Sequence, residues 1–175
     1  MPETYTIRHN QGMRGVALLV VCGCGAHLTS ESAGADARPC DGGDQHATAA
    51  DGSCLVWFGS PMIYRDAQTA CAAMSAHLAY LKTADVDSAA EALCENMDTF
   101  AGGDDLAEPG TFFWNDGTPF VYTDWEAGEP NDGNGKYNEN CLVIAASRAA
   151  KGWDDRPCDP SQVPTSGSFA YICQY

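Results

Sequence analysis

Nine cysteines spread along 175 residues are the feature that most constrains how this chain can fold. They form no Cys-x-x-Cys pair, so a zinc ribbon or a thioredoxin-like redox site is not indicated. Widely spaced cysteines among glycine-rich segments are instead typical of disulfide-bonded domains that fold in an oxidising compartment. The length suits one domain of ordinary size with a hydrophobic core.

Residues 1–24 predict an export signal. Met13 and a basic residue precede a short apolar run, residues 15–21, which ends at small residues and has the form of a signal peptide. The run is far shorter than the roughly 20 residues of a membrane-spanning helix. It also resembles a bacterial lipobox with Cys24 as the lipidated residue, although the cysteine two positions earlier departs from that pattern. Met13 is an alternative start, and the alternative to export is a disordered extension.

The segment that follows predicts a flexible tether over residues 25–39. It is rich in Ala, Gly, Asp and Ser and poor in large apolar side chains, so it cannot bury enough surface to order itself. We expect a single folded domain over residues 40–175.

Oxygen-bearing side chains are concentrated in residues 129–155. This segment contains Glu129-Pro130-Asn131, then Glu139, then Asp154-Asp155. Carboxylate and amide oxygens in loops suit Ca²⁺, which takes about six to eight oxygen ligands, whereas Zn²⁺ prefers His and Cys. The net charge of −15 makes nucleic acid and anionic membrane surfaces poor partners. The sequence therefore predicts calcium as the cofactor.

Two helices are predicted from apolar periodicity. The first spans residues 65–75, and the second is capped by Thr83 and runs to about Met97. Cys94 lies on the apolar stripe of the second helix, so a buried free thiol is its simplest interpretation. Helices followed by short strands and long loops indicate an α+β fold.

Short strands are predicted at residues 56–58, 62–64, 77–81, 142–145 and 169–173. Residues 112–114 and 120–122 predict a β-hairpin around the turn Asn115-Asp116-Gly117. Residues 128–140 form a long, polar, glycine-rich loop, and loops of that length in compact domains are usually functional.

These residues together resemble the C-type lectin-like domain over about residues 54–175. The resemblance is carried by Asp66-Ala67-Gln68 leading to Cys71, His77-Leu78-Ala79, Trp125 ahead of Glu129-Pro130-Asn131, Glu139-Asn140-Cys141, Trp153-Asp154-Asp155, Cys158 and Tyr171-Ile172-Cys173. Each motif is weak alone, and their order and spacing make them specific. Residues 100–103 match a core motif of the family poorly. The resemblance implies two helices packed on short antiparallel sheets, with a long calcium-binding loop region.

The resemblance also implies three disulfides. They are Cys71 with Cys173, Cys141 with Cys158, and Cys40 with Cys54. A pairing of Cys54 with Cys94 competes with the last of these.

Sugar-binding members of this family hold one Ca²⁺ at the positions that match Glu129, Asn131, Glu139, Asp154 and Asp155. Two sugar hydroxyls complete the shell, so Glu129, Asn131, Glu139 and Asp154 are also the implied carbohydrate contacts. The Glu-Pro-Asn order resembles recognition of the mannose type, which covers mannose, glucose, N-acetylglucosamine and fucose. By the same analogy the Glu129–Pro130 bond would be cis.

Asp154 departs from the family, which usually has Asn at this position. An ionised Asp accepts hydrogen bonds but donates none, so the sugar would lose one N–H donor. Four carboxylates at the site predict calcium binding at least as tight as at a three-carboxylate site, together with weaker sugar binding.

A second calcium site is a further expectation from the resemblance. Its candidate residues are Asp105, Glu108, Asp132 and Asn140. Pro109 stands where an acid is expected and Asn140 replaces an Asp, so the alternative is a solvated acidic loop.

The leading hypothesis is an exported lectin, secreted or on the cell surface, that binds glycans through Ca²⁺ and gains avidity if it oligomerises. No membrane contact is expected beyond the lipid anchor at Cys24. The alternative is a module that binds protein or another non-sugar surface, with calcium only ordering the long loop. An enzyme is not expected, because the sequence shows no nucleophile–base pair, phosphate loop or zinc signature.

Overall fold

The computed structural model describes residues 38–159 and 168–175, which form an eight-stranded sheet with two α-helices. The elements in chain order are β1 (Gln45–Thr48), β2 (Cys54–Met62), α1 (Tyr64–Ala73), β3 (His77–Leu78), α2 (Ala84–Leu93), β4 (Thr99–Asp104), β5 (Phe113–Trp114), the 3₁₀ helix η1 (Asp132–Gly135), β6 (Cys141–Ile144), β7 (Trp153–Arg156) and β8 (Phe169–Gln174). The predicted α+β class is confirmed. The predicted export segment with Cys24, and residues 25–37 of the predicted tether, lie outside the described residues.

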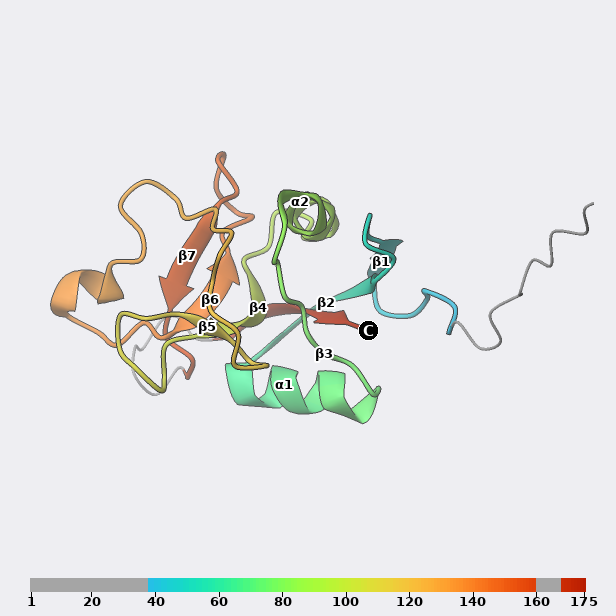
Figure 1. Cartoon of the computed structure of the whole chain (residues 1–175), viewed down its shortest axis with the longest axis horizontal. Helices are drawn as coiled ribbons and strands as arrows, with labels where there is room; N and C mark the ends of the chain where they lie inside the picture. The colour runs from blue at the N-terminus through green and yellow to red at the C-terminus, as the bar shows by residue number, and fades with distance from the viewer. Residues whose placement is uncertain (1–37, 160–167) are drawn as a thin grey trace, which may run out of the picture. The chain divides into compact units, whose positions relative to one another are not determined.

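The C-terminal strand lies in the middle of the sheet. The strand order is β1-β2-β8-β4-β6-β7, with β3 paired to β8 and β5 to β4. β8 runs antiparallel to β2 and parallel to β4. In Figure 1, α1 and α2 lie on opposite sides of these central strands, and β6, β7 and η1 lie at one end. That end holds the predicted calcium ligands.

Both predicted helices form, and α1 buries the apolar face of its sequence. α2 begins where the Thr83 hydroxyl accepts a hydrogen bond from the Val86 N–H at 3.3 Å, as the capping prediction required. It ends at Leu93 rather than near Met97, because Glu95 and Asn96 adopt φ values of 45° and 64°, outside the helical range. Within the described part of the chain, neither helix has the length and apolar character to cross a membrane.

The prediction of two strands at residues 56–58 and 62–64 is wrong, because β2 is one continuous strand. Its pairing with β8 shifts register between Phe58 and Met62. The shift falls at Gly59-Ser60-Pro61, between the two predicted strands, and lets one strand continue through this sequence.

The hairpin predicted from residues 112–114 and 120–122 forms only in part. Its turn is present, because the Gly117 N–H donates to the Trp114 carbonyl at 2.8 Å and the Trp114 N–H to the Thr118 carbonyl at 2.9 Å. Its arms share one antiparallel bridge, from Pro119 to Phe113, and β5 pairs with β4. Phe120 instead stacks its ring on Trp114, with ring centroids 4.1 Å apart. Burial of an aromatic ring outweighs strand pairing at this point.

Residues 100–103, which match the family motif poorly, form a buried part of β4. A Cβ on Gly102 would lie 2.4 Å from the Leu78 carbonyl oxygen, and a Cβ on Gly103 would lie 2.4 Å from the Phe120 ring. Glycine at both positions allows this close approach, so the local packing is complete.

Three disulfides close the domain: Cys40–Cys54, Cys71–Cys173 and Cys141–Cys158. These are the pairings that the resemblance implied, and the competing Cys54–Cys94 bond does not form. Cys94 has a free, buried thiol, and burial raises its pKa to about 12.

Candidate calcium site and adjoining pocket

The candidate site is built where the long loop meets β7. Trp153, the first residue of β7, is fully buried, and its indole N–H donates to the Asp87 carboxylate at 2.9 Å. The main chain ties the loop to this residue, because the Glu126 N–H donates to the Trp153 carbonyl at 2.8 Å and the Trp153 N–H to the Asp124 carbonyl at 2.7 Å. A fixed Trp153 thus holds the next two residues of the strand in place. The Glu129–Pro130 bond of the loop is cis.

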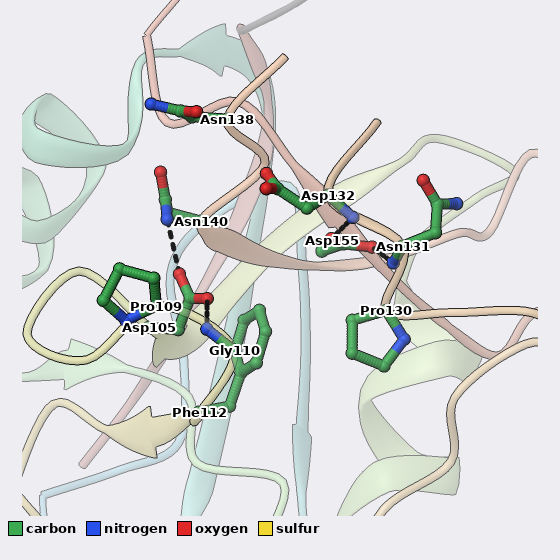
Figure 2. Close-up of a pocket in the computed structure, with 10 residues that line it drawn as sticks. All are labelled: Asp105, Pro109, Gly110, Phe112, Pro130, Asn131, Asp132, Asn138, Asn140 and Asp155. Carbon is green, nitrogen blue, oxygen red and sulfur yellow. Dashed lines mark hydrogen bonds between the residues drawn. The ribbon is translucent and has the colours of Figure 1, made fainter. Parts of the chain in front are cut away.

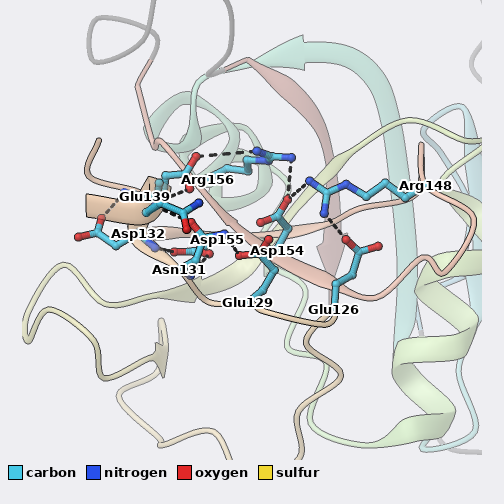
Figure 3. Close-up of polar contacts among 11 residues, drawn as sticks. Glu126, Glu129, Asn131, Asp132, Glu139, Arg148, Asp154, Asp155 and Arg156 are labelled. Carbon is cyan, nitrogen blue, oxygen red and sulfur yellow. Dashed lines mark hydrogen bonds and ion pairs between the residues drawn. The ribbon is translucent and has the colours of Figure 1, made fainter. Parts of the chain in front are cut away.

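Three of the five predicted calcium ligands converge. Glu129, Asp154 and Asp155 each place a carboxylate oxygen within 4.8 Å of the others (Figure 3). Asp154 and Asp155 are each 1% exposed, and Glu129 is half-buried. Buried carboxylate oxygens at this spacing suit a hard divalent cation.

The other two predicted ligands, Asn131 and Glu139, lie beside this group with their oxygens engaged elsewhere. The Asn131 amide donates to Glu129, and its carbonyl oxygen accepts from the Asn134 N–H at 2.8 Å. Glu139 accepts from the Gly133 N–H at 2.7 Å. Coordination by all five residues therefore requires these two side chains to turn toward the three converging carboxylates.

Asp155 also fixes the loop backbone. One of its oxygens accepts from the Asn131 N–H at 2.9 Å and the other from the Asp132 N–H at 2.7 Å. Each oxygen of an ionised carboxylate has a second lone pair, so these bonds leave Asp155 able to bind a cation.

The electrostatics of the site favour a bound cation. The pKa of Glu129 is raised to about 7, first by burial and then by the negative charges of Asp154 and Asp155. Burial also raises the pKa of Glu139 and of Asp154. A divalent cation would relieve this unfavourable concentration of charge, so the donor set fits calcium in both chemistry and charge.

Two arginines belong to the site, and the sequence analysis missed both. Arg148 and Arg156 pair with the same oxygen of Asp154, at 2.5 and 2.6 Å (Figure 3). Arg148 also pairs with Glu126, and Arg156 lies 3.8 Å from Glu139. Side chains two residues apart in a strand lie on the same face, so the sequence could have indicated that Arg156 lies beside Asp154. Arg148 comes from the loop between β6 and β7 and carries no such signal.

A second group of three carboxylates consists of Asp87, Glu91 and Asp124. Asp87 accepts hydrogen bonds from the Tyr122 hydroxyl and from the Trp153 indole, both at 2.9 Å. These bonds make Asp87 a structural anchor for Trp153.

The four residues predicted for a second calcium site do not converge on one point. Asp105, Asp132 and Asn140 line one pocket, shown in Figure 2, whereas Glu108 lines another. One Asp105 oxygen accepts from the Asn140 amide at 2.6 Å and the other from the Gly110 N–H at 2.6 Å. Each Asp105 oxygen thus already has one N–H donor within the protein.

Comparison with known proteins identifies the family. The model of the lectin C-type domain matches residues 60–175. The chain belongs to the C-type lectin domain family.

Individual relatives carry different descriptions. An alpha-N-acetylgalactosamine-specific lectin of Patiria pectinifera is 29% identical over 134 residues, which cover 71% of this chain and 74% of that protein. A C-type lectin mannose-binding isoform of Oxyuranus scutellatus is 29% identical over 131 residues, which cover 71% of this chain and 77% of that protein. A solved structure of a Ca²⁺-dependent type II antifreeze protein in its Ca²⁺-free form has a TM-score of 0.60 and 28% identity, covering 71% of this chain and 93% of that one.

Proposed function

We propose that this domain is a calcium-dependent lectin that binds neutral sugars through one Ca²⁺. The proposed ligands are Glu129, Asn131, Glu139, Asp154 and Asp155. The observation that carries the proposal is the convergence of the Glu129, Asp154 and Asp155 carboxylates at the edge of the long loop. Membership of the lectin C-type domain family supports it.

The calcium ion would supply positive charge that attracts sugar hydroxyl oxygens. The protein side chains then orient the sugar, because each hydroxyl donates to a carboxylate such as Glu129 and accepts from an amide such as that of Asn131. Both residues lie in the loop that the Trp153 contacts hold against β7. The proposed site therefore combines two residues of β7 with a loop that is hydrogen-bonded to the same strand.

The proposed sugars are those of the mannose type: mannose, glucose, N-acetylglucosamine and fucose. The Glu-Pro-Asn order of residues 129–131 supports this class, as does similarity to a relative described as mannose-binding. The relative described as specific for alpha-N-acetylgalactosamine makes galactose-type sugars the necessary comparison.

A glycan array probed with and without EDTA tests the proposal. We expect binding to mannose-type glycans in calcium and its loss in EDTA. The Asp155→Asn variant should lose binding, whereas Asp85→Asn, which changes an exposed acid on α2, should retain it. Calcium-independent binding, or binding to galactose-type sugars alone, would contradict the proposal.

A second candidate function is a module for a non-sugar ligand, in which calcium only orders the loop. Asp154 favours it, because its carboxylate lacks the N–H donor that the family's Asn provides. Similarity to a Ca²⁺-dependent antifreeze protein favours it as well. Calcium binding in a calorimeter without any glycan binding on the array would select this function.

We also propose that the protein is exported and acts on glycans at a surface, with avidity from oligomers. The three disulfides support an oxidising compartment. The mass of the mature N-terminus separates secretion from lipid attachment at Cys24, and the mass of the native particle reports the oligomeric state.

A further inference from the structure

Two adjoining pockets lie beside the turn that follows β5, and they share no lining residue with the candidate calcium site. The acidic pocket, of about 510 Å³, is lined by Asp104, Glu108, Phe113, Trp114, Asn115 and Gly117 among others. The apolar pocket, of about 280 Å³, is lined by Lys82, Trp114, Thr118, Pro119 and Val121. Trp114 lines both pockets, and Gly117 and Thr118 are consecutive, so the two pockets are neighbours.

No cation pairs with the two acids of the acidic pocket in the part of the chain that the structure describes. Asp104 accepts its shortest hydrogen bond, at 2.7 Å, from the neutral amide of Asn115. Glu108 is exposed, and among the described residues its carboxylate has no hydrogen-bond or ion-pair partner. By contrast, Asp116 in the turn itself pairs with Lys82 at 2.6 Å. The negative charges of Asp104 and Glu108 are therefore available to a cation from outside the protein.

Phe113 and Trp114 give the acidic pocket an aromatic wall. Phe113 is half-buried, so part of its ring is open to a ligand. Aromatic faces attract cations, and guanidinium groups pack on them. The side chains of Lys and Arg carry an apolar stem below a charged head. A basic side chain therefore matches both the carboxylates and the aromatic wall of this pocket.

The apolar pocket provides a neighbouring place for an apolar side chain. Val121 is 91% exposed and lies there with Pro119 and Thr118. A small free amine would leave this apolar surface uncovered. In an extended polypeptide, side chains two residues apart lie on the same face at a spacing of about 7 Å, so one segment can enter both pockets. The two pockets together thus suit a protein segment rather than a small amine.

We propose that this surface docks an extended basic segment of a protein partner, with a Lys or Arg side chain in the acidic pocket and an apolar side chain in the apolar pocket. The net charge of −15 favours the approach of a basic partner. The proposal goes beyond lectin activity and does not depend on it, because neither calcium nor sugar takes part in this contact.

An NMR titration of the protein with the blocked pentapeptide Gly-Arg-Gly-Leu-Gly tests the proposal at physiological ionic strength. We expect saturable shifts of the Ala107 and Gly117 amides, with the same affinity in calcium and in EDTA. The peptide with Gln in place of Arg should bind about tenfold more weakly, as expected for the loss of a hydrogen-bonded charge. Shifts confined to the long loop of residues 128–140, or no saturable shift at Ala107 and Gly117, would overturn the proposal.

A pair of matched variants separates the pocket from general charge attraction. Asp104→Asn with Glu108→Gln should weaken binding of the Arg peptide about tenfold. Asp66→Asn with Asp85→Asn removes the same charge from exposed acids of α1 and α2, and should weaken binding less than about twofold. An equal loss in both variants would show that net charge alone attracts the peptide, and would overturn the proposal.

Glu108→Gln alone keeps the test valid if the change at Asp104 disturbs the fold, because Glu108 is exposed. This variant should weaken binding of the Arg peptide about threefold. Unchanged affinity in Glu108→Gln would count against the acidic pocket as the binding place. A failure of the glycan array to show sugar binding would leave this proposal standing.

Discussion

Arg156 pairs with Asp154 at 2.6 Å, two residues earlier on the same face of β7. Arg148 reaches the same Asp154 oxygen from the loop between β6 and β7. Four candidate carboxylate ligands and these two guanidiniums sum to a charge of −2, which one Ca²⁺ cancels. The expectation that calcium binds at least as tightly as at a three-carboxylate site counted only the carboxylates, and the two guanidiniums offset half of their charge.

Removing both arginines should destabilise the calcium-free domain. Asp154 is 1% exposed, so Arg148→Met with Arg156→Met leaves a buried charge unpaired and should cost about 3 kcal/mol in unfolding free energy. Adding Asp154→Asn to this variant should restore most of the loss, because the charge is then gone. Urea unfolding in EDTA measures the unfolding free energy of both variants.

Lys82→Met is the control for that experiment. It breaks the ion pair between Lys82 and Asp116, whose side chains are 41% and 34% exposed. The unfolding free energy should fall by less than about 1 kcal/mol. An equally small loss in the double arginine variant would show that the pairs with Asp154 contribute little.

Asp154→Asn should strengthen sugar binding. The substitution returns an N–H₂ donor to the position, and a hydrogen bond to one hydroxyl corresponds to an affinity gain of about two- to tenfold. Titration of methyl α-mannoside at saturating calcium measures the gain. Unchanged affinity would mean that this position does not contact the sugar, and Asp85→Asn serves as the matched control.

The elements that sequence predicted well are those with local signals. Thr83 caps α2 through a bond to a residue three positions later, and the apolar face of α1 follows a helical repeat. The paired cysteines and Trp153 follow motifs with fixed spacing. Such features need no knowledge of what lies across the sheet.

Features that depend on distant packing could not be predicted in this way. The hairpin after β5 extends no further than one bridge, and Phe120 stacks on Trp114 instead of continuing the strand. The bond between Asn140 and Asp105 joins residues 35 apart, so no local pattern in the sequence indicates it. Arg148 reaches Asp154 across a turn, so only the three-dimensional structure shows that the pair neutralise each other.

Calcium should stabilise the domain by mass action. At a free concentration one hundred times its Kd, calcium adds about 2.7 kcal/mol to the unfolding free energy. Asp155→Asn should abolish this increment, because it removes one of the three converging oxygens. Urea unfolding with calcium and with EDTA gives the increment for each variant, which separates it from any change in the calcium-free protein. If Asp155→Asn keeps the full increment, the calcium ion binds elsewhere in the protein.

Cys94 should be unreactive in the native protein and free after unfolding. Its side chain is fully buried, its thiol donates to the Ala90 carbonyl at 3.1 Å, and burial raises its pKa to about 12. Both features suppress the thiolate that alkylating reagents require. Alkylation before and after unfolding, followed by peptide mapping, should label Cys94 only after unfolding and Cys54 in neither case. Label on Cys54 without reduction would contradict the Cys40–Cys54 pairing.

Asp87 should make the domain less stable as pH rises from 4 to 7. Burial raises its pKa from 3.8 to about 6, despite hydrogen bonds from Trp153 and Tyr122 that favour the charged form. Between these two pKa values the folded state binds more protons than the unfolded state, so the unfolding free energy falls as pH increases. The loss reaches about 3 kcal/mol near neutral pH, given about 1.4 kcal/mol per pKa unit.

Asp87→Asn removes this titration and keeps an acceptor for the Trp153 indole. The difference in unfolding free energy between the variant and the wild type should therefore shift in favour of the variant by about 2 kcal/mol from pH 4 to pH 7, because part of the full loss occurs below pH 4. Taking the difference cancels the titration of acids that do not interact with Asp87, and EDTA removes any calcium contribution. The Asp87 charge helps to raise the pKa of Glu91, so both proteins are compared in a Glu91→Gln background. Asp85→Asn, on the exposed side of the same helix, should give a difference that does not vary with pH. A flat difference for Asp87→Asn would show that Asp87 is charged in the folded domain throughout this range, and that its two hydrogen bonds outweigh burial.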